Sequence, residues 1–391
     1  MTPAARVQAA IEILDLVIEA ARSNGPPADR LIGDWFRPRR FAGSKDRRTV
    51  RELAYRAIRA CGEVPETGRA AMLRVAELDP EIARLFDGSP HAPAPVGAGE
   101  PAASGGVAPG WLVERLARSG VTEAEAISLL GRAPLDVRVN TLKAGRVTLP
   151  EGGERTVAAN GWRYPPDTRI EDSEAYLKGA VEVQDTGSQL ACEAVGARPG
   201  ETVIDLCAGA GGKTLALAAA MDDRGMLIAS DADRARLSRL APRAERAGAT
   251  AMETVLLDPG REMRALERWG GAADAVLVDA PCSGTGTWRR NPEARWRLTP
   301  AQLGRYVQVQ ARLLDVAAKL VRPGGRLIFV TCSLLDEEGA SQAQAFLDRH
   351  QGWRAEPPAL PAGSERGWGL RLSPWHDGTD GFFVARFACL C

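Results

Sequence analysis

The stretch that decides the fold reads Asp279-Ala280-Pro281-Cys282-Ser283-Gly284-Thr285-Gly286. It follows four apolar residues, 275–278, which are typical of a buried parallel strand. A second apolar run, 327–330, leads in the same way into Thr331-Cys332-Ser333. In open α/β sheets, ligands bind at the carboxyl ends of the strands. A carboxylate and two thiols are therefore predicted at the ligand-binding edge of a parallel sheet.

A glycine-rich loop, 207–214, follows another predicted strand at 202–206. Its glycines let the backbone approach a ligand, and the helix that begins behind it offers free N–H groups. The spacing before Lys213 does not match a phosphate-binding loop. Four predicted strands close on or beside an acidic residue, namely Asp205, Asp231, Asp258 and Asp279. Aspartate often begins turns, but that explains one or two such residues more easily than four. The set therefore predicts a cofactor that contains a nucleoside.

Strands alternate with helices from about residue 181 to the C-terminus, as in α/β proteins with a parallel sheet. The stretch 382–387 is predicted as a last, antiparallel strand. Residues 1–87 carry apolar residues at helical spacing and predict an all-α domain. Residues 88–110 are rich in Gly, Pro and Ala and are predicted to be a linker that does not order itself. We assign 111–180 to a connecting subdomain that binds RNA and 181–391 to the catalytic domain.

Composition excludes several classes of protein. The 391 residues include 50 basic and 50 acidic side chains, so the net charge indicates no partner. No apolar run approaches the roughly 20 residues of a membrane span. Seven cysteines without framework spacing favour a reducing cytosol, and we expect a cytoplasmic protein. The three histidines are scattered and no paired CxxC motif is present, so we expect no metal.

Positive charge is nevertheless concentrated in the N-terminal part. Between Arg30 and Ala60 there are ten basic and three acidic residues, interleaved with Trp35, Phe41 and Tyr55. One interpretation is a face that binds phosphates with aromatic help. The other is a solvated arginine face on a helix whose aromatic residues lie in the core. The spacing does not separate these interpretations.

A second basic and aromatic stretch, 287–297, comes directly after Gly286. It contains Trp288, Trp296 and several arginines. It is interpreted either as a loop that contacts nucleic acid or as a surface loop docked by its two tryptophans. A capping box with proline at the first helical position then predicts a helix from 299 to about 320.

These motifs together resemble the RNA (cytosine-5)-methyltransferase family, in its RsmB/Sun group with Nop2/NSUN relatives. The resemblance rests on the glycine loop, the Pro-Cys segment and the Thr-Cys-Ser segment, with support from 138–143, 183–189 and 379–383. It covers roughly 109–387. Residues 42–48, within the helical region, resemble the NusB-like RNA-binding domain of RsmB-type members. The resemblance implies a Rossmann-like sheet that uses S-adenosylmethionine, preceded by a short all-α NusB-like domain.

The resemblance also implies roles for particular residues. Carbon 5 of cytosine becomes nucleophilic once a thiolate has added to carbon 6. The family pattern assigns that attack to Cys332 and the release of the product to Cys282. Asp279 would hydrogen-bond the ring nitrogen, and Lys213 would lie close enough to favour charge on a neighbouring thiolate or on Asp279. Cys61, Cys192 and Cys207 are interpreted as buried apolar residues, and Cys389 and Cys391 as part of a frayed terminus.

The expected cofactor is S-adenosylmethionine, with Asp231 on the ribose hydroxyls and Asp258 near the adenine. The cofactor-binding residues are predicted to be Cys207, Ala208, Gly209, Ala210, Gly211, Gly212, Lys213, Asp231, Asp258 and Asp279.

The expected function is cytosine-5 methylation of 16S ribosomal RNA by a monomer. Two alternatives are methylation of transfer RNA and a non-catalytic RNA-binding assembly factor. A methyltransferase for proteins or small molecules would need neither two cysteines at strand ends nor a basic aromatic loop beside them.

Overall fold

The computed structural model describes residues 1–23, 25–143, 145 and 148–390. Its chain forms two compact units that are not continuous in sequence. The first contains Met1–Gly131 and Thr287–Thr299, and the second contains Arg132–Gly286 and Pro300–Cys391. The predicted connecting subdomain at 111–180 is thus divided, because 111–131 lie in the first unit and 132–180 in the second.

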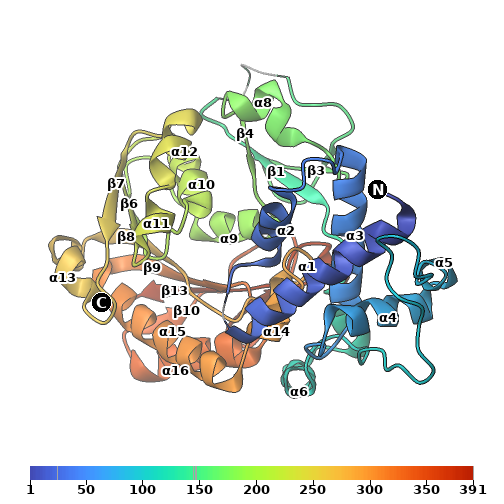
Figure 1. The fold of residues 1–391 in the computed structure, drawn as a ribbon. Coiled ribbons are helices and arrows are strands. Elements are labelled where there is room, and N and C mark those ends of the chain that lie inside the picture. The colour runs from blue at the N-terminus through green and yellow to red at the C-terminus, as the bar shows by residue number, and fades with distance from the viewer. Residues whose placement is uncertain (24, 144, 146–147, 391) are drawn as a thin grey trace. The chain divides into compact units, whose positions relative to one another are not determined.

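The first unit is helical, as its apolar spacing predicts (Figure 1). Its helices are α1 (Pro3–Ser23), α2 (Ala28–Phe36), α3 (Ser44–Ala60), α4 (Gly68–Leu78), α5 (Pro80–Ala83), α6 (Gly110–Arg118), α7 (Glu123–Ser128) and α14 (Ala294–Arg297). The apolar faces of α1, α3 and α4 form one core that includes Val7, Leu14, Ile58 and Met72. The predicted stop of α1 begins at Asn24, which lies outside the described residues.

The segment Thr287–Thr299 belongs to the helical unit although it follows the Pro-Cys stretch in sequence. Trp288 is fully buried, and Trp296 packs in the core of the helices. Arg295, also fully buried, donates from Nη2 to the carbonyl oxygens of Ile58 (2.6 Å) and Cys61 (2.8 Å) at the end of α3. Cations at helix C-termini satisfy the last carbonyls in this way. The interpretation as a nucleic-acid-contacting loop is therefore wrong for Trp288, Arg295 and Trp296, whose side chains are inside the protein.

The stretch 88–110 has defined partners in the same unit. Arg69 of α4 donates to the carboxylate of Glu100 and to the carbonyl oxygens of Ala94 and Pro95. Gly105 forms a β-bridge with Cys61. Hydrogen bonds and one arginine hold this stretch in place, together with some apolar burial, since Ala108 is buried and Ala102 and Ala103 pack against the helical core. Its composition does not reveal these contacts.

The second unit is built on a nine-stranded mixed sheet with the strand order β11-β12-β13-β9-β8-β5-β6-β7, in which β10 also pairs with β13. The strands are β5 (Thr202–Asp205), β6 (Met226–Asp231), β7 (Met252–Leu256), β8 (Ala273–Asp279), β9 (Val321–Thr331), β10 (Trp353–Ala355), β11 (Ser364–Arg366), β12 (Gly369–Leu372) and β13 (Phe382–Cys389). Strands β7, β6, β5, β8 and β9 are parallel to one another. The predicted last strand, β13, runs antiparallel to β9. This is the predicted Rossmann-like α/β fold.

Helices cover both faces of this sheet (Figure 1). One face carries α9 (Thr186–Val195), α10 (Gly212–Ala220), α11 (Arg234–Leu237) and α12 (Leu240–Ala247). The other carries α13 (Glu262–Leu266), α15 (Pro300–Leu320) and α16 (Ala340–Arg349). Because both faces are covered, the central strands read as continuous apolar runs. The short helix α17 (Pro374–Asp377) precedes β13.

A separate four-stranded antiparallel sheet precedes the large one, with the strand order β2-β3-β1-β4. Its strands are β1 (Leu135–Val139), β2 (Glu154–Arg155), β3 (Gly161–Tyr164) and β4 (Val181–Val183), and α8 (Glu174–Leu177) precedes β4. The alternation of apolar and polar residues over 135–140 predicts the first of these strands, whereas the other three are not predicted from the sequence. Within the part of the chain that the structure describes, no helix is long and apolar enough to span a bilayer.

Candidate active site at the carboxyl edge of the sheet

The two cysteine motifs meet at the ends of neighbouring parallel strands. Asp279 at the end of β8 pairs in register with Val330 of β9, so the loops that follow leave the same edge. The sulfur atoms of Cys282 and Cys332 lie 3.4 Å apart. Both side chains are partly buried. The structure thus brings together the two thiols that the sequence placed at strand ends.

Lys213 and Asp279 form an ion pair beside the thiols. Lys213 Nζ donates to Asp279 Oδ2 at 2.8 Å, and the lysine side chain is 11% exposed. Burial acts to lower the pKa of Lys213, but the Asp279 carboxylate and the neighbouring thiols of Cys192 and Cys332 outweigh it and raise this pKa. Lys213 therefore keeps its proton at neutral pH and presents a fixed positive charge to the site.

Glu338 fastens the two cysteine loops to each other. It is fully buried, and its Oε1 accepts from the backbone N–H of Ser283 (2.8 Å) and from Gln310 Nε2 (3.1 Å). Its Oε2 accepts from the Ser283 hydroxyl. Its own carbonyl oxygen accepts from Thr331 Oγ1 at 3.1 Å. Glu338 thereby fixes the residue after Cys282 through its carboxylate and the residue before Cys332 through its backbone carbonyl.

Further contacts lock the same two loops. Ser333 Oγ lies 3.2 Å from Ser283 Oγ and 3.1 Å from Thr285 Oγ1. Gly286 donates its N–H to the Cys332 carbonyl oxygen at 3.0 Å. A Cβ atom at Gly286 would lie only 2.1 Å from the Gly381 carbonyl oxygen, so the backbone needs glycine there. The separation of the two sulfurs is thus set by the scaffold around them.

The environment of Cys282 disfavours its thiolate. The contact with the Cys332 thiol, burial and the negative charge of Glu338 all raise the pKa of Cys282 well above its ordinary value. Cys282 is therefore a thiol at neutral pH. At 3.4 Å from the Cys332 sulfur, a Cys282 thiol can donate to a thiolate on Cys332 and stabilise its negative charge.

The glycine loop leads from β5 into α10 with its backbone turned toward the same edge of the sheet. Gly209 and Gly211 have φ angles of 55° and 87°, the left-handed region that favours glycine. The Gly209 N–H donates to Asp231 Oδ2 at 2.7 Å, and Arg243 Nη1 donates to the Ala210 carbonyl oxygen at 2.7 Å. Gly212 begins α10, and a Cβ atom there would meet nothing within 4 Å. The loop is held from both sides and leaves space at the start of the helix.

The predicted acidic residues occupy different environments. Asp231, at the end of β6, is buried, and its Oδ1 accepts from the N–H of Asp233 at 2.7 Å. Asp258 follows β7 and is exposed. Asp205 is fully buried, its Oδ2 accepts from Thr214 Oγ1 at 2.7 Å, and its Oδ1 has no partner among the described residues. Burial and the nearby charge of Asp279 raise the pKa of Asp205 to about 7 despite that hydrogen bond.

The other cysteines divide as follows. Cys61 and Cys192 are buried, as interpreted from the sequence, and burial raises the pKa of Cys61 to about 11 and that of Cys192 to about 12. Cys207, partly buried in the glycine loop, also has a pKa raised by burial. The prediction of a frayed terminus is wrong for Cys389, which is buried in β13 and pairs in register with Trp353. Cys391 lies outside the described residues.

Two residues near the site were not assigned a role from the sequence. Glu338 belongs to an acidic run, 336–338, that follows the Thr-Cys-Ser segment, and this proximity was the available signal. Arg138 in β1 is buried, and its only hydrogen bond within the described residues is from Nε to Gln184 Oε1 at 2.7 Å. A buried arginine whose two terminal nitrogens have no hydrogen-bond partner among the described residues is unusual, and its place at the start of the family-like segment 138–143 was the available signal.

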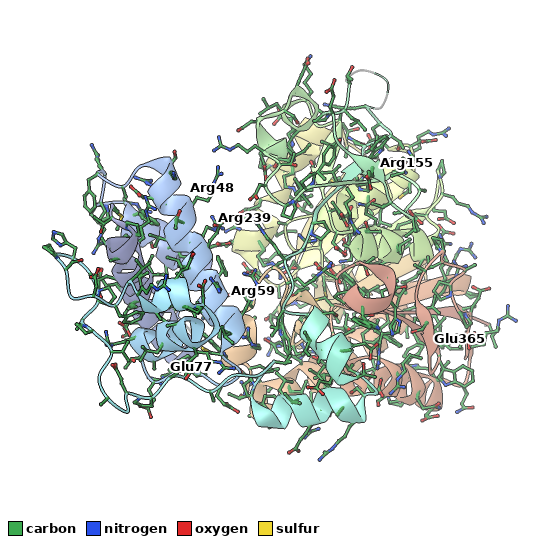
Figure 2. The ribbon with its side chains drawn as sticks, turned by 90° about the vertical axis from the view of Figure 1, so that its right-hand side faces the viewer. Arg48, Arg59, Glu77, Arg155, Arg239 and Glu365 are labelled. Atoms are coloured by element: carbon green, nitrogen blue, oxygen red, sulfur yellow. The ribbon has the colours of Figure 1, made fainter. Side chains whose placement is uncertain are left out.

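The basic face predicted on α3 is mostly paired within its own unit. Arg51 and Arg56 form ion pairs with Asp29 (2.5 Å) and Asp79 (2.7 Å). Arg47 donates to the Ala42 carbonyl oxygen, and the Arg59 guanidinium lies 5.4 Å from the centre of the Tyr55 ring. Arg48 is exposed and has no partner among the described residues; Figure 2 shows it and Arg59 on α3. Four of the five arginines on this helix thus have a partner within their own unit.

Comparison with known proteins gives a consistent result. Residues 193–388 match the family model described as 16S rRNA methyltransferase RsmB/F. The chain is 35% identical over 299 residues to a probable ribosomal RNA small subunit methyltransferase B of Synechocystis sp., and 35% identical over 297 residues to a ribosomal RNA small subunit methyltransferase B of Xylella fastidiosa. Each match covers 71% of this chain, and 66% and 68% of the relatives, so the chain spans about two thirds of their length. The crystal structure of PH0851 superposes with a TM-score of 0.75 and 25% identity, covering 99% of both chains.

Proposed function

Because the chain belongs to the family of 16S rRNA methyltransferases RsmB/F, we propose that it methylates carbon 5 of a cytosine in 16S ribosomal RNA with S-adenosylmethionine as donor. The observation that carries the proposal is the pair of sulfurs 3.4 Å apart at the edge where Lys213 and Asp279 are paired. Two thiols in contact suit a reaction in which one adds to a ring and the other handles a proton. The names of the relatives favour ribosomal RNA over transfer RNA.

The residues of the glycine loop fit S-adenosylmethionine. The loop 207–213 exposes backbone at the start of α10, where nothing would meet a Cβ atom at Gly212. Asp231 lies at the end of the adjacent strand and already binds the loop through the Gly209 N–H. We assign the ribose hydroxyls to Asp231 and the adenine end to the neighbourhood of Asp258. When bound, the cofactor supplies an electrophilic methyl group.

In the proposed reaction the Cys332 thiolate adds to carbon 6 of cytosine, forming a carbon–sulfur bond. The electrons of the 5,6 double bond move toward the ring nitrogen, which takes a proton from water and returns it when the double bond re-forms. Asp279, held by Lys213, accepts a hydrogen bond from the resulting N–H. Carbon 5 becomes nucleophilic and takes the methyl group. Cys282, after its own proton has passed to water, accepts the proton from carbon 5. The double bond re-forms and the bond between Cys332 and carbon 6 breaks.

The first test separates the two thiols. Cys332→Ala cannot form the adduct, so it should be inactive and never become attached to RNA. Cys282→Ala can attack and methylate but cannot complete release, so it should accumulate a protein–RNA species that survives denaturing electrophoresis. Cys389→Ala is the matched control, because this thiol lies in β13 at the opposite edge of the sheet. An adduct with Cys332→Ala and none with Cys282→Ala would reverse the roles.

A second test addresses the cofactor. Asp231→Ala leaves two ribose hydroxyls without an acceptor, and the affinity for S-adenosylmethionine should fall by about 1–3 kcal/mol in isothermal calorimetry. Asp233→Ala on the neighbouring turn is the control, because its side chain caps α11. Unchanged binding by Asp231→Ala would remove the ribose assignment. Bisulfite sequencing of RNA from cells with and without the protein would identify the methylated cytosine and separate ribosomal from transfer RNA.

A further inference from the structure

The helical unit contains a cavity of about 730 Å³. Its floor is one face of α1, including Gln8 and Glu12, and its walls are Trp35, Arg39 and Phe41. His91, from the stretch 88–110, lines the rim. The volume is in the range of sites for small molecules. All of these residues belong to the first unit, and none of them has a role in the reaction proposed above.

The walls of this cavity offer surfaces on which a planar ring can stack. Phe41 is 74% exposed, more than any other large apolar residue in the described part of the chain. Trp35 carries the Arg39 guanidinium 3.8 Å from its ring centre. Exposed aromatic rings next to arginine are the usual platform for unpaired bases, because every base has a face that can stack.

The floor offers hydrogen-bonding groups that the protein does not use. Glu12 Oε2 accepts from Trp35 Nε1 at 3.2 Å, whereas Glu12 Oε1 and the Gln8 side-chain amide have no partner among the described residues. The two residues are one helical turn apart, so they share a face of α1. A carboxylate oxygen and an amide beside an aromatic wall match the polar edge of a nucleobase.

Unpaired positive charge lies next to the cavity in sequence. Arg40 stands between the lining residues Arg39 and Phe41, and Lys45 follows shortly after; both side chains are exposed and neither has a partner within the described residues. Farther along α3, Arg51 and Arg56 are instead paired with aspartates. The positive charge available for phosphates in this region is therefore Arg40, in the turn between α2 and α3, with Lys45 and Arg48 near the start of α3.

We propose that this cavity binds an unpaired nucleotide of RNA, with its base against Phe41, its polar edge on Gln8 and Glu12, and its phosphates near Arg40. The proposal rests on the proposed function, because it takes the substrate to be RNA, and it adds a requirement for a single-stranded feature in that RNA. A carboxylate at the edge favours a base that presents N–H donors.

The test uses the full chain and a fluorescein-labelled 12-nucleotide single-stranded RNA of mixed sequence, alone or annealed to its complement. Phe41→Ala should weaken binding of the single strand about tenfold in fluorescence anisotropy, whereas Phe41→Trp, which keeps a ring, should restore it. Binding of the duplex should change less than twofold. Leu78→Ala is the matched control, because Leu78 is 61% exposed in the same unit and does not line the cavity.

Equal affinity of Phe41→Ala and the wild type for the single strand would overturn the proposal, and so would an equal loss for single strand and duplex. The first result is also the one expected if the cavity serves a peptide. The proposed function fails separately: it fails if the wild-type protein transfers no methyl group to RNA. A wild-type protein that methylates RNA while Phe41→Ala binds the single strand normally would remove only the cavity proposal.

Discussion

Glu338 binds Ser283 next to Cys282, and its negative charge acts on the Cys282 thiol. Besides the contact with Cys332 and burial, this charge raises the pKa of Cys282. Glu338→Gln keeps an acceptor for the Ser283 N–H but removes the charge. Cys282 must lose its proton before it can take one from carbon 5, so the rate at which the wild type releases free methylated RNA in a single turnover should rise with pH beyond the ordinary thiol range, roughly pH 8.5. In Glu338→Gln this rise should occur at lower pH.

The control is Glu365→Gln, the same chemical change at an exposed position in β11 (Figure 2). It should leave the pH profile as in the wild type. If the rate of Glu338→Gln is lowered by the same factor at every pH, and the profile is not shifted along the pH axis, then Glu338 only holds the loops together.

Asp205 makes stability depend on pH in a direction opposite to that of a paired carboxylate. Its pKa is about 7 in the folded protein because it is buried, whereas an aspartate in an unfolded chain titrates near 4. Between these values the folded state holds a proton that the unfolded state has released. This group therefore lowers the free energy of unfolding as the pH rises from about 4 to 7, by at most about 1.4 kcal/mol per pH unit.

Asp205→Asn removes that titration while its amide oxygen can still accept from Thr214. Urea unfolding followed by circular dichroism at pH 5 and pH 8 should show a smaller difference between the two pH values in the variant than in the wild type. The prediction is contradicted if the two proteins lose equal stability between pH 5 and pH 8.

At the scale of elements, Gly286 and Gly381 set how closely two loops approach. Gly286→Ala would force the Gly381 backbone away and disturb the hydrogen bond from Gly286 to the Cys332 carbonyl oxygen. Methylation should fall at least tenfold, with a stability loss of about 1–3 kcal/mol. Gly304→Ala in α15 is the matched control: it meets nothing within 4 Å and should stabilise the protein by about 0.5–1 kcal/mol. Full activity of Gly286→Ala would remove the role of this contact.

The elements that are predicted correctly from the sequence are those whose pattern lies in their own residues or in the residues next to them. Strands β8 and β9 are apolar runs, and α15 has its own proline and capping residues, so their positions follow from neighbouring residues. The Cys282–Cys332 contact also follows, because parallel strands that are adjacent deliver their loops to one edge. That the two strands are adjacent is seen in the sheet topology and was not predicted from the runs themselves.

The parts that could not be predicted depend on partners distant in sequence. The basic and aromatic stretch around Arg295 suggests contact with nucleic acid. The structure shows instead that the guanidinium donates to the carbonyl oxygens of Ile58 and Cys61. The position of Cys389 near the C-terminus predicts a frayed end, but in the structure this residue pairs with Trp353 in the sheet. The function of Glu338 depends on Ser283, 55 residues away. No local pattern encodes these contacts.

At the scale of the whole molecule, the helical unit is completed by Thr287–Thr299. From the sequence one expects that deleting residues 1–87 leaves cofactor binding intact. Because Trp296 packs in the core that those residues form, the truncated chain should instead expose apolar surface, bind a hydrophobic dye and aggregate. Replacing 287–299 by a Gly/Ser linker in the same truncation should restore solubility and S-adenosylmethionine binding, measured by light scattering and calorimetry. A soluble, dye-negative truncation without that replacement would contradict this.

The interleaving of the two units also imposes an order on synthesis. A ribosome delivers a chain from its N-terminus, and domains generally fold as units when their residues have emerged. The helices α1 to α4 appear early, but Trp288, Arg295 and Trp296 emerge only after β5, β6, β7 and β8 have been made. Until then the carbonyls at the end of α3 lack their arginine and the helical core lacks a tryptophan. The first unit must therefore wait, partly assembled, for the middle of the second to be translated.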